Sequence, residues 1–453
     1  FEVMLANDEF KAQIEEEMRK VALVYQRFKE LQMVQEMNMA EFKQAKHELR
    51  QRLATLNDLL NRRQFHASGM ADYDRWLATH QPFNWLAEFY QIIHDNGGFD
   101  VIIGNPPYVV YTDNSFCYKV SNTYTTKCCG NLYAFCVERS ELLKCMDGRF
   151  GMIIPNSSIS AQKMAPLQKV ISHNKCCWIS NYSWRPAKLF EGADMLLAII
   201  LNKHALPRIT YASRYQKWYN ECRPFLFQSC SYHNVTNIVT DGSIPKLPSV
   251  LYRSIMMRQT VVSNGAYLTN LFLQESIHKL YYFRAVQYWF KVLVDEPLYD
   301  EDGVHKVTGE MKPIFCATED LRDLLVSILS SSTFFLNYIV WSSCQVVNGR
   351  DFNLAFNIGS ISPELVCKLS KLGKDIEADY QNNSHVVERN YSKKGRVFTM
   401  RKQHFYIKYS KPIIDEIDKV LAKHYGFTDE ELDFIINYDI KYRMGDELNG
   451  DGE

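Results

Sequence analysis

Asn105, Pro106, Pro107 and Tyr108 follow one another, and together they carry the groups needed to hold a planar exocyclic amine. The side-chain amide oxygen of Asn105 and the carbonyl of Pro106 can each accept one N–H of such an amine, which leaves the nitrogen lone pair as a nucleophile. Pro106 and Pro107 fix φ at two successive positions, so both acceptors have little conformational entropy left to lose. Tyr108 offers a flat face for a ring. The tetrapeptide predicts an amino-group methylation site, with an ordinary turn as the alternative.

A short apolar run precedes the tetrapeptide and predicts a strand over residues 99–104. Its centre, Val101-Ile102-Ile103, is typical of a strand in a parallel sheet that is buried on both faces. Ligands of such sheets bind just beyond the carboxyl ends of the strands. Because the tetrapeptide occupies that position, a pocket is favoured over a turn.

Helices and strands are expected to alternate around this strand. The sequence predicts a helix over 86–94, a polar loop over 111–126, a helix over 131–144, a strand over 148–155, a helix over 160–173 that restarts near Pro166, and strands over 178–183 and 196–201. This alternation indicates an α/β fold with a doubly wound, Rossmann-like sheet.

The first 68 residues contain neither Gly nor Pro and are rich in good helix formers, which predicts long helix. The second half of this segment is basic, with Lys43, Lys46, Arg50, Arg52, Arg62 and Arg63. Two interpretations stay open. The segment is either a helical spacer that lies along a phosphate backbone or a solvated amphipathic hairpin, and the hairpin is favoured.

Beyond Lys203 the clean alternation stops, which predicts a separate domain of mixed α+β structure. A helix is expected over 360–379. Residues 380–410 interleave basic and aromatic side chains, which suits contacts with phosphate groups, although an exposed basic helix or loop is the alternative. Two helices are expected over 412–425 and 428–438, with Thr428 as the N-cap of the second and Glu431 completing a capping box.

Composition narrows the classes of function. A chain of 453 residues suits two or three domains. Lys+Arg and Asp+Glu both number 52, so a DNA-binding face has to arise from local clustering. No apolar stretch of about 18 residues and no charged-then-apolar leader occurs, so we expect a cytoplasmic protein without a membrane span. Twelve cysteines occur without Cys-x-x-Cys spacing, which predicts free thiols and no metal site.

Several ordered blocks resemble the N6-adenine-specific DNA methyltransferases. They are Gln81–Tyr90, Gly98–Tyr108, Gly130–Phe135, Gly148–Ser157 and Arg185–Ala193. The similarity is greatest to the class with a C-terminal specificity domain, which is found in type IIG restriction-modification enzymes and BREX phage-resistance methyltransferases. It spans nearly the whole chain and is strongest from about residue 82 to residue 201.

The resemblance implies roles for individual residues. Asn105 and Pro106 would hold the N6 amine of a flipped-out adenine, Pro107 would stiffen the turn, and Tyr108 would stack on the base. Phe190 would pack against the other face or edge of the adenine, or it belongs to the core. Asn131 and Tyr133 begin a helix and are expected to serve that helix alone.

The resemblance also implies S-adenosylmethionine as the methyl donor. Such enzymes bind it through an acidic, Gly-rich loop, roughly Asp-Pro-x-x-Gly-x-Gly, and no such string occurs in this chain. We therefore expect a fragment that lacks the N-terminal cofactor-loop half, is inactive alone, and is completed by a cofactor-binding or nuclease segment of the same parent protein. Asp100 is expected near the cofactor adenine, with capping of a neighbouring loop as the alternative.

The same resemblance divides the chain into a helical spacer (1–80), the catalytic half of a methyltransferase domain (81–204), a target-recognition domain (205–411) and a C-terminal helical segment (412–453). Double-stranded DNA is the expected partner. Candidate DNA contacts are the cations of aromatic-basic segments, Arg284, Lys291, Lys393, Lys394 and Arg396. The aromatic residues beside Arg284 and Lys291 are core residues in the alternative interpretation.

Three functional hypotheses follow. The first is methyl transfer to N6 of adenine in restriction-modification or phage defence. The second is a catalytically incomplete DNA-recognition or scaffold protein that needs a cofactor-binding partner or an upstream segment. The third is a protein-glutamine or RNA methyltransferase, which the long domain after Lys203 disfavours.

Overall fold

The computed structural model describes residues 8–33, 38–116, 119–240, 242–306, 308–393 and 396–445. The chain forms two compact units. The first unit comprises Phe1–Met152, Lys169–His173 and Leu201–His204, and the second comprises Ile153–Gln168, Asn174–Ile200 and Ala205–Glu453. Since these units do not coincide with the four predicted domains, that division stays a prediction.

A helical hairpin opens the first unit, which confirms the favoured interpretation of the Gly- and Pro-free segment. Helices α1 (Asp8–Met33) and α2 (Met39–Ser68) pack together, and the Asn38 side chain caps α2 by accepting from the backbone N–H of Ala40. A third helix, α3, spans Tyr73–His80.

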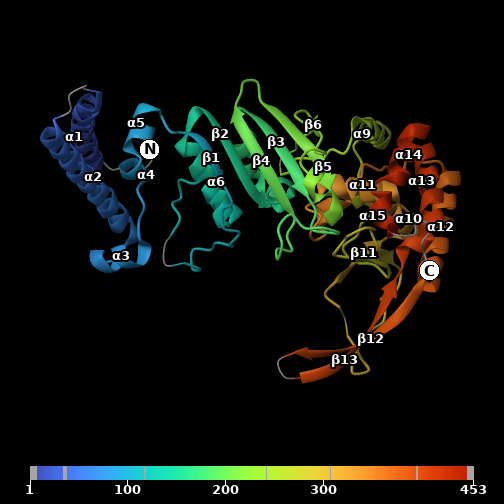
Figure 1. The fold of residues 1–453 in the computed structure, drawn as a ribbon. Coiled ribbons are helices and arrows are strands. Elements are labelled where there is room, and N and C mark those ends of the chain that lie inside the picture. Colours follow the sequence, from blue (N-terminus) through green and yellow to red (C-terminus); the bar gives the residue numbers. More distant parts are fainter. Residues whose placement is uncertain are drawn as a thin grey trace. The chain divides into compact units, whose positions relative to one another are not determined.

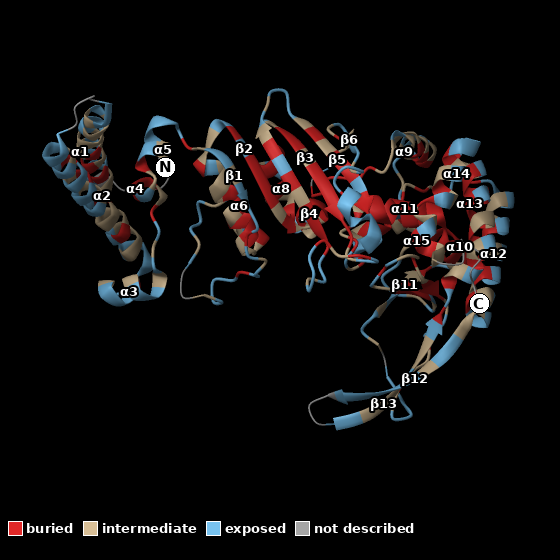
Figure 2. Cartoon of the chain, viewed as in Figure 1, coloured by how far each residue is buried: buried red, intermediate tan, exposed pale blue. Residues whose placement is uncertain are grey.

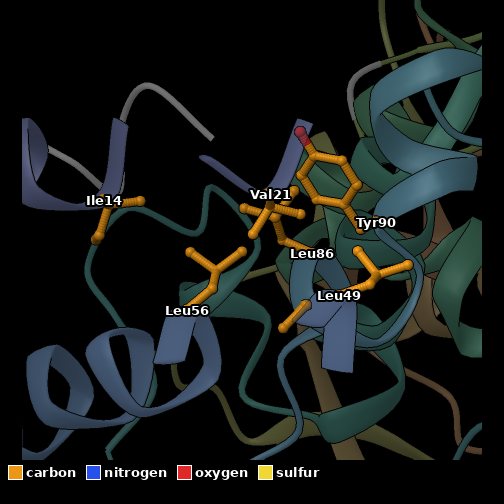
Figure 3. Packing of buried hydrophobic residues seen from close by; sticks show 7 residues of the cluster. Ile14, Val21, Leu49, Leu56, Leu86 and Tyr90 are labelled. Carbon is orange, nitrogen blue, oxygen red and sulfur yellow. The ribbon is translucent and has the colours of Figure 1, made fainter. Parts of the chain in front are cut away.

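The hairpin shares a hydrophobic core with the next two helices, α4 (Trp85–Glu88) and α5 (Tyr90–Asp95). Figure 3 shows this cluster, whose buried members are Ile14, Val21, Leu49, Leu56, Leu86, Ala87 and Tyr90. Apolar side chains from both sides of the predicted boundary at residue 80 therefore exclude water together.

Six strands form a mixed sheet in the order β1-β2-β4-β3-β5-β6 (Figure 1). They are β1 (Phe99–Gly104), β2 (Lys144–Pro155), β3 (Lys175–Tyr182), β4 (Leu197–His204), β5 (Ile209–Gln216) and β6 (Tyr232–Asn234). Strands β1 and β2 pair in parallel, as do β3 and β5, whereas β5 and β6 are antiparallel. The α/β class is confirmed, and the Rossmann-like arrangement stays a prediction.

Strand β1 lies at the edge of the sheet and is not buried on both faces. Val101 is 58% exposed and Ile103 is 77% exposed. The prediction of double burial is wrong, because the face of β1 that carries Val101 and Ile103 is open to solvent. Strand β1 is also outermost in the strand order, beside β2. Gly98 precedes β1 with φ +134°, and an added Cβ would lie 2.5 Å from the Leu143 carbonyl oxygen, so this entry to the strand requires glycine.

The elements of this region follow the predicted alternation with two changes. The single helix expected over 86–94 is broken at Phe89 into α4 and α5. Helix α6 (Leu132–Leu143) precedes β2. The single helix expected over 160–173 is instead a turn of α-helix, α7 (Ser157–Ser160), a 3-10 turn, η3 (Gln162–Met164), and a restarted helix, α8 (Ala165–Ser172). Pro166 sits at the start of α8, where its missing N–H costs no helical hydrogen bond.

The second unit continues as helices and two small sheets, in line with the predicted α+β character. The sheets are β11-β7-β8 and β10-β9-β13-β12. Their strands are β7 (His278–Phe283), β8 (Val292–Leu293), β9 (Tyr299–Glu301), β10 (Val304–His305), β11 (Met311–Cys316), β12 (Ser384–Lys393) and β13 (Arg396–Phe405). The basic stretch, for which a helix or loop was the alternative, is therefore an antiparallel ribbon of β12 and β13.

After the large sheet, the helices of the second unit are α9 (Val250–Ser263), α10 (Glu319–Ser330), α11 (Ser332–Trp341), α12 (Pro363–Asn382), α13 (Lys411–Tyr425), α14 (Asp429–Asn437) and α15 (Ile440–Met444). Thr428 and Glu431 form the predicted capping box of α14. Within the described ranges no single helix is long and apolar enough to cross a bilayer, and α10 and α11 pass that test only as a pair, bent by 64°.

Helix α11 is buried from Ser332 to Val340 (Figure 2), so its terminal backbone groups need protein partners. At its start, the Asp418 carboxylate from α13 accepts the backbone N–H groups of Ser332 and Thr333, each at 2.9 Å. At its end, the Lys246 ammonium donates to the carbonyl oxygens of Val340 and Ser342. A negative charge at the N-terminus and a positive charge at the C-terminus also interact favourably with the helix dipole.

We expect Asp418→Asn to lower the free energy of unfolding by about 2 kcal/mol, because an amide can serve only one of the two positions at which the carboxylate accepts. Glu416→Gln, on the same helix, removes a solvent-accessible pair with Lys419 and should cost at most about 0.5 kcal/mol. Urea unfolding of both variants measures the difference. Equal losses would mean that the carboxylate does not cap α11.

Candidate functional site

The tetrapeptide directly follows β1, as predicted. Asn105 and Pro107 are exposed, Pro106 is buried and Tyr108 is half-buried. The buried Pro106 anchors the turn, while the Asn105 side chain stays open at the carboxyl end of a parallel strand. This placement fits the predicted pocket. The role of each residue toward an amine stays a prediction.

The chain after Tyr108 is fixed to the start of α6. The Leu132 N–H donates to the Val109 carbonyl at 3.0 Å, and the Tyr111 N–H donates to the Gly130 carbonyl at the same distance. Asn131 occupies the N-cap position, but its side chain makes no capping hydrogen bond. The backbone therefore holds this segment, and the Asn131 side chain is not used in the expected capping role.

Tyr108 is oriented by Tyr133. The two rings meet edge to face, with centroids 6.1 Å apart and an interplanar angle of 87°. Tyr133 is 2% exposed, so it forms a fixed wall for the half-buried Tyr108 ring. Burial raises the pKa of Tyr108 to about 12, which keeps its phenol neutral at physiological pH.

Glu138 is a positioning residue that the sequence reasoning missed. From α6 its carboxylate accepts the backbone N–H groups of Thr125 and Thr126, both at 2.9 Å, and the hydroxyls of the same residues at 3.0 and 2.6 Å. It thereby anchors the end of the loop predicted over 111–126. Its role could have been suspected from the sequence, because this acid lies on the apolar face of α6 beside the buried Ala134 and Val137.

We expect Glu138→Ala to speed amide hydrogen exchange at Thr125 and Thr126 by about tenfold or more, because four hydrogen bonds to a charged acceptor are lost. Asp147→Asn, an exposed acid after the same helix, is the control and should leave these amides unchanged. Exchange followed by mass spectrometry or NMR gives the rates. Unchanged exchange in the Glu138 variant would show that the loop is held by other contacts.

Phe190 belongs to the second unit and lines a cavity of about 680 Å³ with Leu189, Arg223 and Phe227 among its walls. It is 38% exposed, so the alternative of a core position does not apply. The Arg223 guanidinium fixes the preceding backbone by donating to the carbonyls of Lys188 and Leu189, both at 2.7 Å. Because the tetrapeptide lies in the first unit, its joint action with Phe190 stays a prediction.

Asp100 is exposed on β1, where its carboxylate accepts the Cys145 thiol from β2 at 3.8 Å. It caps no loop through the contacts that the structure shows. Its predicted place near the cofactor adenine stays a prediction. The sequence contains no acidic Gly-rich loop of the expected Asp-Pro-x-x-Gly-x-Gly type, and the expectation that S-adenosylmethionine needs a further segment stays a prediction.

The aromatic part of the predicted DNA-reading segment is core. Tyr281 and Tyr282 are each 7% exposed and Phe290 is 2% exposed. Lys291 is largely enclosed, with its ammonium 4.1 Å from the Phe283 ring centroid, and Arg284 is half-buried. Burial, with a smaller effect of Lys402, lowers the pKa of Lys291 to about 8. The predicted DNA contacts of Arg284 and Lys291 stay predictions.

Of the other predicted DNA contacts, Lys393 and Arg396 are residues of the β12–β13 ribbon. Arg396 is exposed and donates to the Asp302 carboxylate at 2.9 Å. Lys394 and the side chain of Lys393 lie outside the described residues.

We expect the free energy of unfolding to rise as pH increases from about 8 to about 10.5, with Lys291 as a cause. The folded protein loses the Lys291 proton near pH 8, whereas the unfolded chain retains it to an ordinary lysine pKa, so the unfolded state binds more protons in that window. Lys291→Met should remove this part of the rise, and Lys279→Met, an exposed lysine, should not. Urea unfolding at pH 7 and 9.5 tests this, and identical pH dependence in the wild type and Lys291→Met would contradict it.

Comparison with known proteins gives a family match for the first part of the chain. Residues 10–190 match the Eco57I restriction-modification methylase family. This match confirms the resemblance to restriction-modification methyltransferases. It runs across the predicted boundary at residue 80, as does the shared core of α1, α2, α4 and α5.

A curated relative agrees with the Eco57I match. The putative type II restriction enzyme and methyltransferase RM.MjaORFECS2P of Methanocaldococcus jannaschii is 28% identical over 201 residues, which cover 42% of this chain and 16% of the relative. The chain thus spans about a sixth of that relative's length.

Two solved structures are similar to this chain at low scores. The type IIL restriction-modification enzyme MmeI in complex with DNA is 12% identical, with a TM-score of 0.38 over 76% of this chain and 57% of that one. A nuclease-deletion mutant of the type ISP enzyme LlaGI with a DNA substrate mimic is 10% identical, with a TM-score of 0.36 over 78% and 51%.

Proposed function

We propose that this chain is the adenine-binding and DNA-recognition portion of a DNA methyltransferase that modifies N6 of a flipped-out adenine. The observation that carries the proposal is the open Asn105 at the carboxyl end of β1, next to a buried Pro106 and a Tyr108 ring fixed by Tyr133. The Eco57I methylase match supports it. Restriction-modification or phage defence in the cytoplasm is the proposed setting.

The residues of this chain hold the base and its amine. Asn105 Oδ1 and the Pro106 carbonyl each accept one N6 hydrogen, which leaves the nitrogen lone pair directed at a methyl donor. Tyr108 stacks on the base, a contact worth about 1–3 kcal/mol, which offsets an unstacking cost of a few kcal/mol. S-adenosylmethionine supplies the methyl group when a complete cofactor site is present.

A second candidate is supported by the exposed apolar side chains of the edge strand β1. Val101 and Ile103 face solvent on a strand whose outer backbone groups can pair with another strand. This favours a catalytically incomplete DNA-recognition or scaffold protein that needs a cofactor-binding partner or an upstream segment. The two candidates share the DNA partner and differ in whether the parent protein methylates that DNA.

The test uses the protein expressed from its natural coding sequence, with any upstream segment, incubated with duplex DNA and S-adenosylmethionine. Adenine N6-methylation is read by mass spectrometry of nucleosides. We expect Asn105→Ala to lower kcat/KM by about 100-fold or more, because an acceptor aimed at the reacting amine is lost. Asn114→Ala, in the exposed loop that follows, is the matched control.

Substitutions of Tyr108 test the stacking role of its ring independently of Asn105. Tyr108→Phe should keep activity within about threefold, since the ring does the stacking, while Tyr108→Ala should weaken binding of the base by about 10-fold or more. Methylation of cytosine, or adenine methylation unaffected by Asn105→Ala, would refute the main proposal. Duplex binding without methylation by the parent protein would favour the second candidate.

A further inference from the structure

The β12–β13 ribbon sorts its side chains onto two unlike faces. Successive residues of a strand point to opposite faces, and residues paired across an antiparallel ladder share a face. Tyr391 pairs with Phe398 and Arg389 with Met400. One side, here called the basic ribbon face, therefore carries His385, Arg389, Tyr391, Phe398, Lys402 and His404. The opposite face carries Glu388, Asn390, Thr399 and Arg401.

Cations gather on the basic ribbon face. Partial burial, followed by the charges of Lys402, Lys291, His385 and Arg389, lowers the pKa of His404, so these groups lie within electrostatic reach of one another. The acids at its margin are Glu310, which pairs with Lys402, Asp302, which pairs with Arg396 of the same face, and Glu301, which stands opposite Met400.

Arg389 and Arg401 differ in their partners. Arg389 is exposed and has no ion-pair partner among the residues that the structure describes. Arg401, on the opposite face, has two carboxylates nearby, Asp300 at 3.7 Å and Glu388 at 3.9 Å. The positive charge that is open to a further ligand thus lies on the basic ribbon face.

The outer part of the ribbon is accessible and carries aromatic rings. Strand β9 pairs with β13 only at residues 400–402, so the segment toward the tip has two strands (Figure 1). Most of its side chains are exposed or half-buried (Figure 2). Tyr391 and Phe398 stack there with centroids 5.9 Å apart, and Tyr391 is 38% exposed.

We propose that the basic ribbon face lies in the major groove of duplex DNA, with Arg389 directed at phosphates or base edges. The major groove, about 12 Å wide, admits a two-stranded ribbon without distortion, whereas the minor groove, about 6 Å wide, has to be widened and the duplex bent before a ribbon enters it. Ten residues of strand span about 33 Å, close to one turn of the duplex. The inference rests on the proposed DNA partner and adds the element and the face that contact it.

The experiment measures binding of the full chain to a fluorescent duplex of about 30 base pairs from 50 to 200 mM salt. Arg389→Gln should raise Kd at least fivefold at 50 mM salt and reduce the slope of log K against log salt by about 1. Arg401→Gln makes the same charge change on the opposite face and should stay within twofold. Both sites are exposed, and thermal unfolding verifies that both variants fold.

Three outcomes would overturn the proposal, and they separate it from the proposed function. Equal effects of the two substitutions, with duplex binding retained, would refute the assigned face and leave the DNA partner intact. Displacement by the minor-groove ligand netropsin but not by the major-groove ligand methyl green would refute the groove. Absence of duplex binding by the wild-type chain would refute the DNA partner itself.

Discussion

The second unit depends on the burial of α11. A helix without access to water must find protein partners for its terminal N–H and C=O groups, and Asp418 and Lys246 supply them from two distant parts of the sequence. Those two charges are themselves buried and satisfied only if α13 and the segment before α9 are in place. The Phe334 ring of α11 packs against the Phe290 ring, with centroids 4.7 Å apart. The segment just before β8 therefore belongs to the same core.

The first unit is less enclosed at the end that carries the tetrapeptide. Its core is complete where α1, α2, α4 and α5 meet, yet its strand β1 leaves Val101 and Ile103 in solvent. The tetrapeptide is attached to that open strand and obtains its order from the other side, through Tyr133 and the backbone at the start of α6. Rigidity at the site therefore comes from α6 and does not require the outer edge of the sheet to be covered.

Local signals in the sequence predicted local structure well. Periodicity and capping residues gave α12, α13 and α14, and the apolar run gave β1. The exposure of β1 and the burial of Tyr281 could not be predicted in the same way, because both depend on which distant segments pack nearby. The basic stretch illustrates the same limit. Its composition indicated that the stretch is basic. Which face of the ribbon carries that charge is determined by the register in which β12 pairs with β13. Glu138 was missed because its four donors lie outside its own helix.

Pairing in the ribbon also constrains how the sequence can change over evolutionary time. A single-residue insertion or deletion within β12 would move every residue beyond it to the other side, exchanging Arg389 for a neighbour such as Glu388 or Asn390. Changes of two residues preserve the alternation and only lengthen or shorten the ribbon. Length variants of this hairpin that keep the same residues on each face should therefore differ by even numbers of residues per strand.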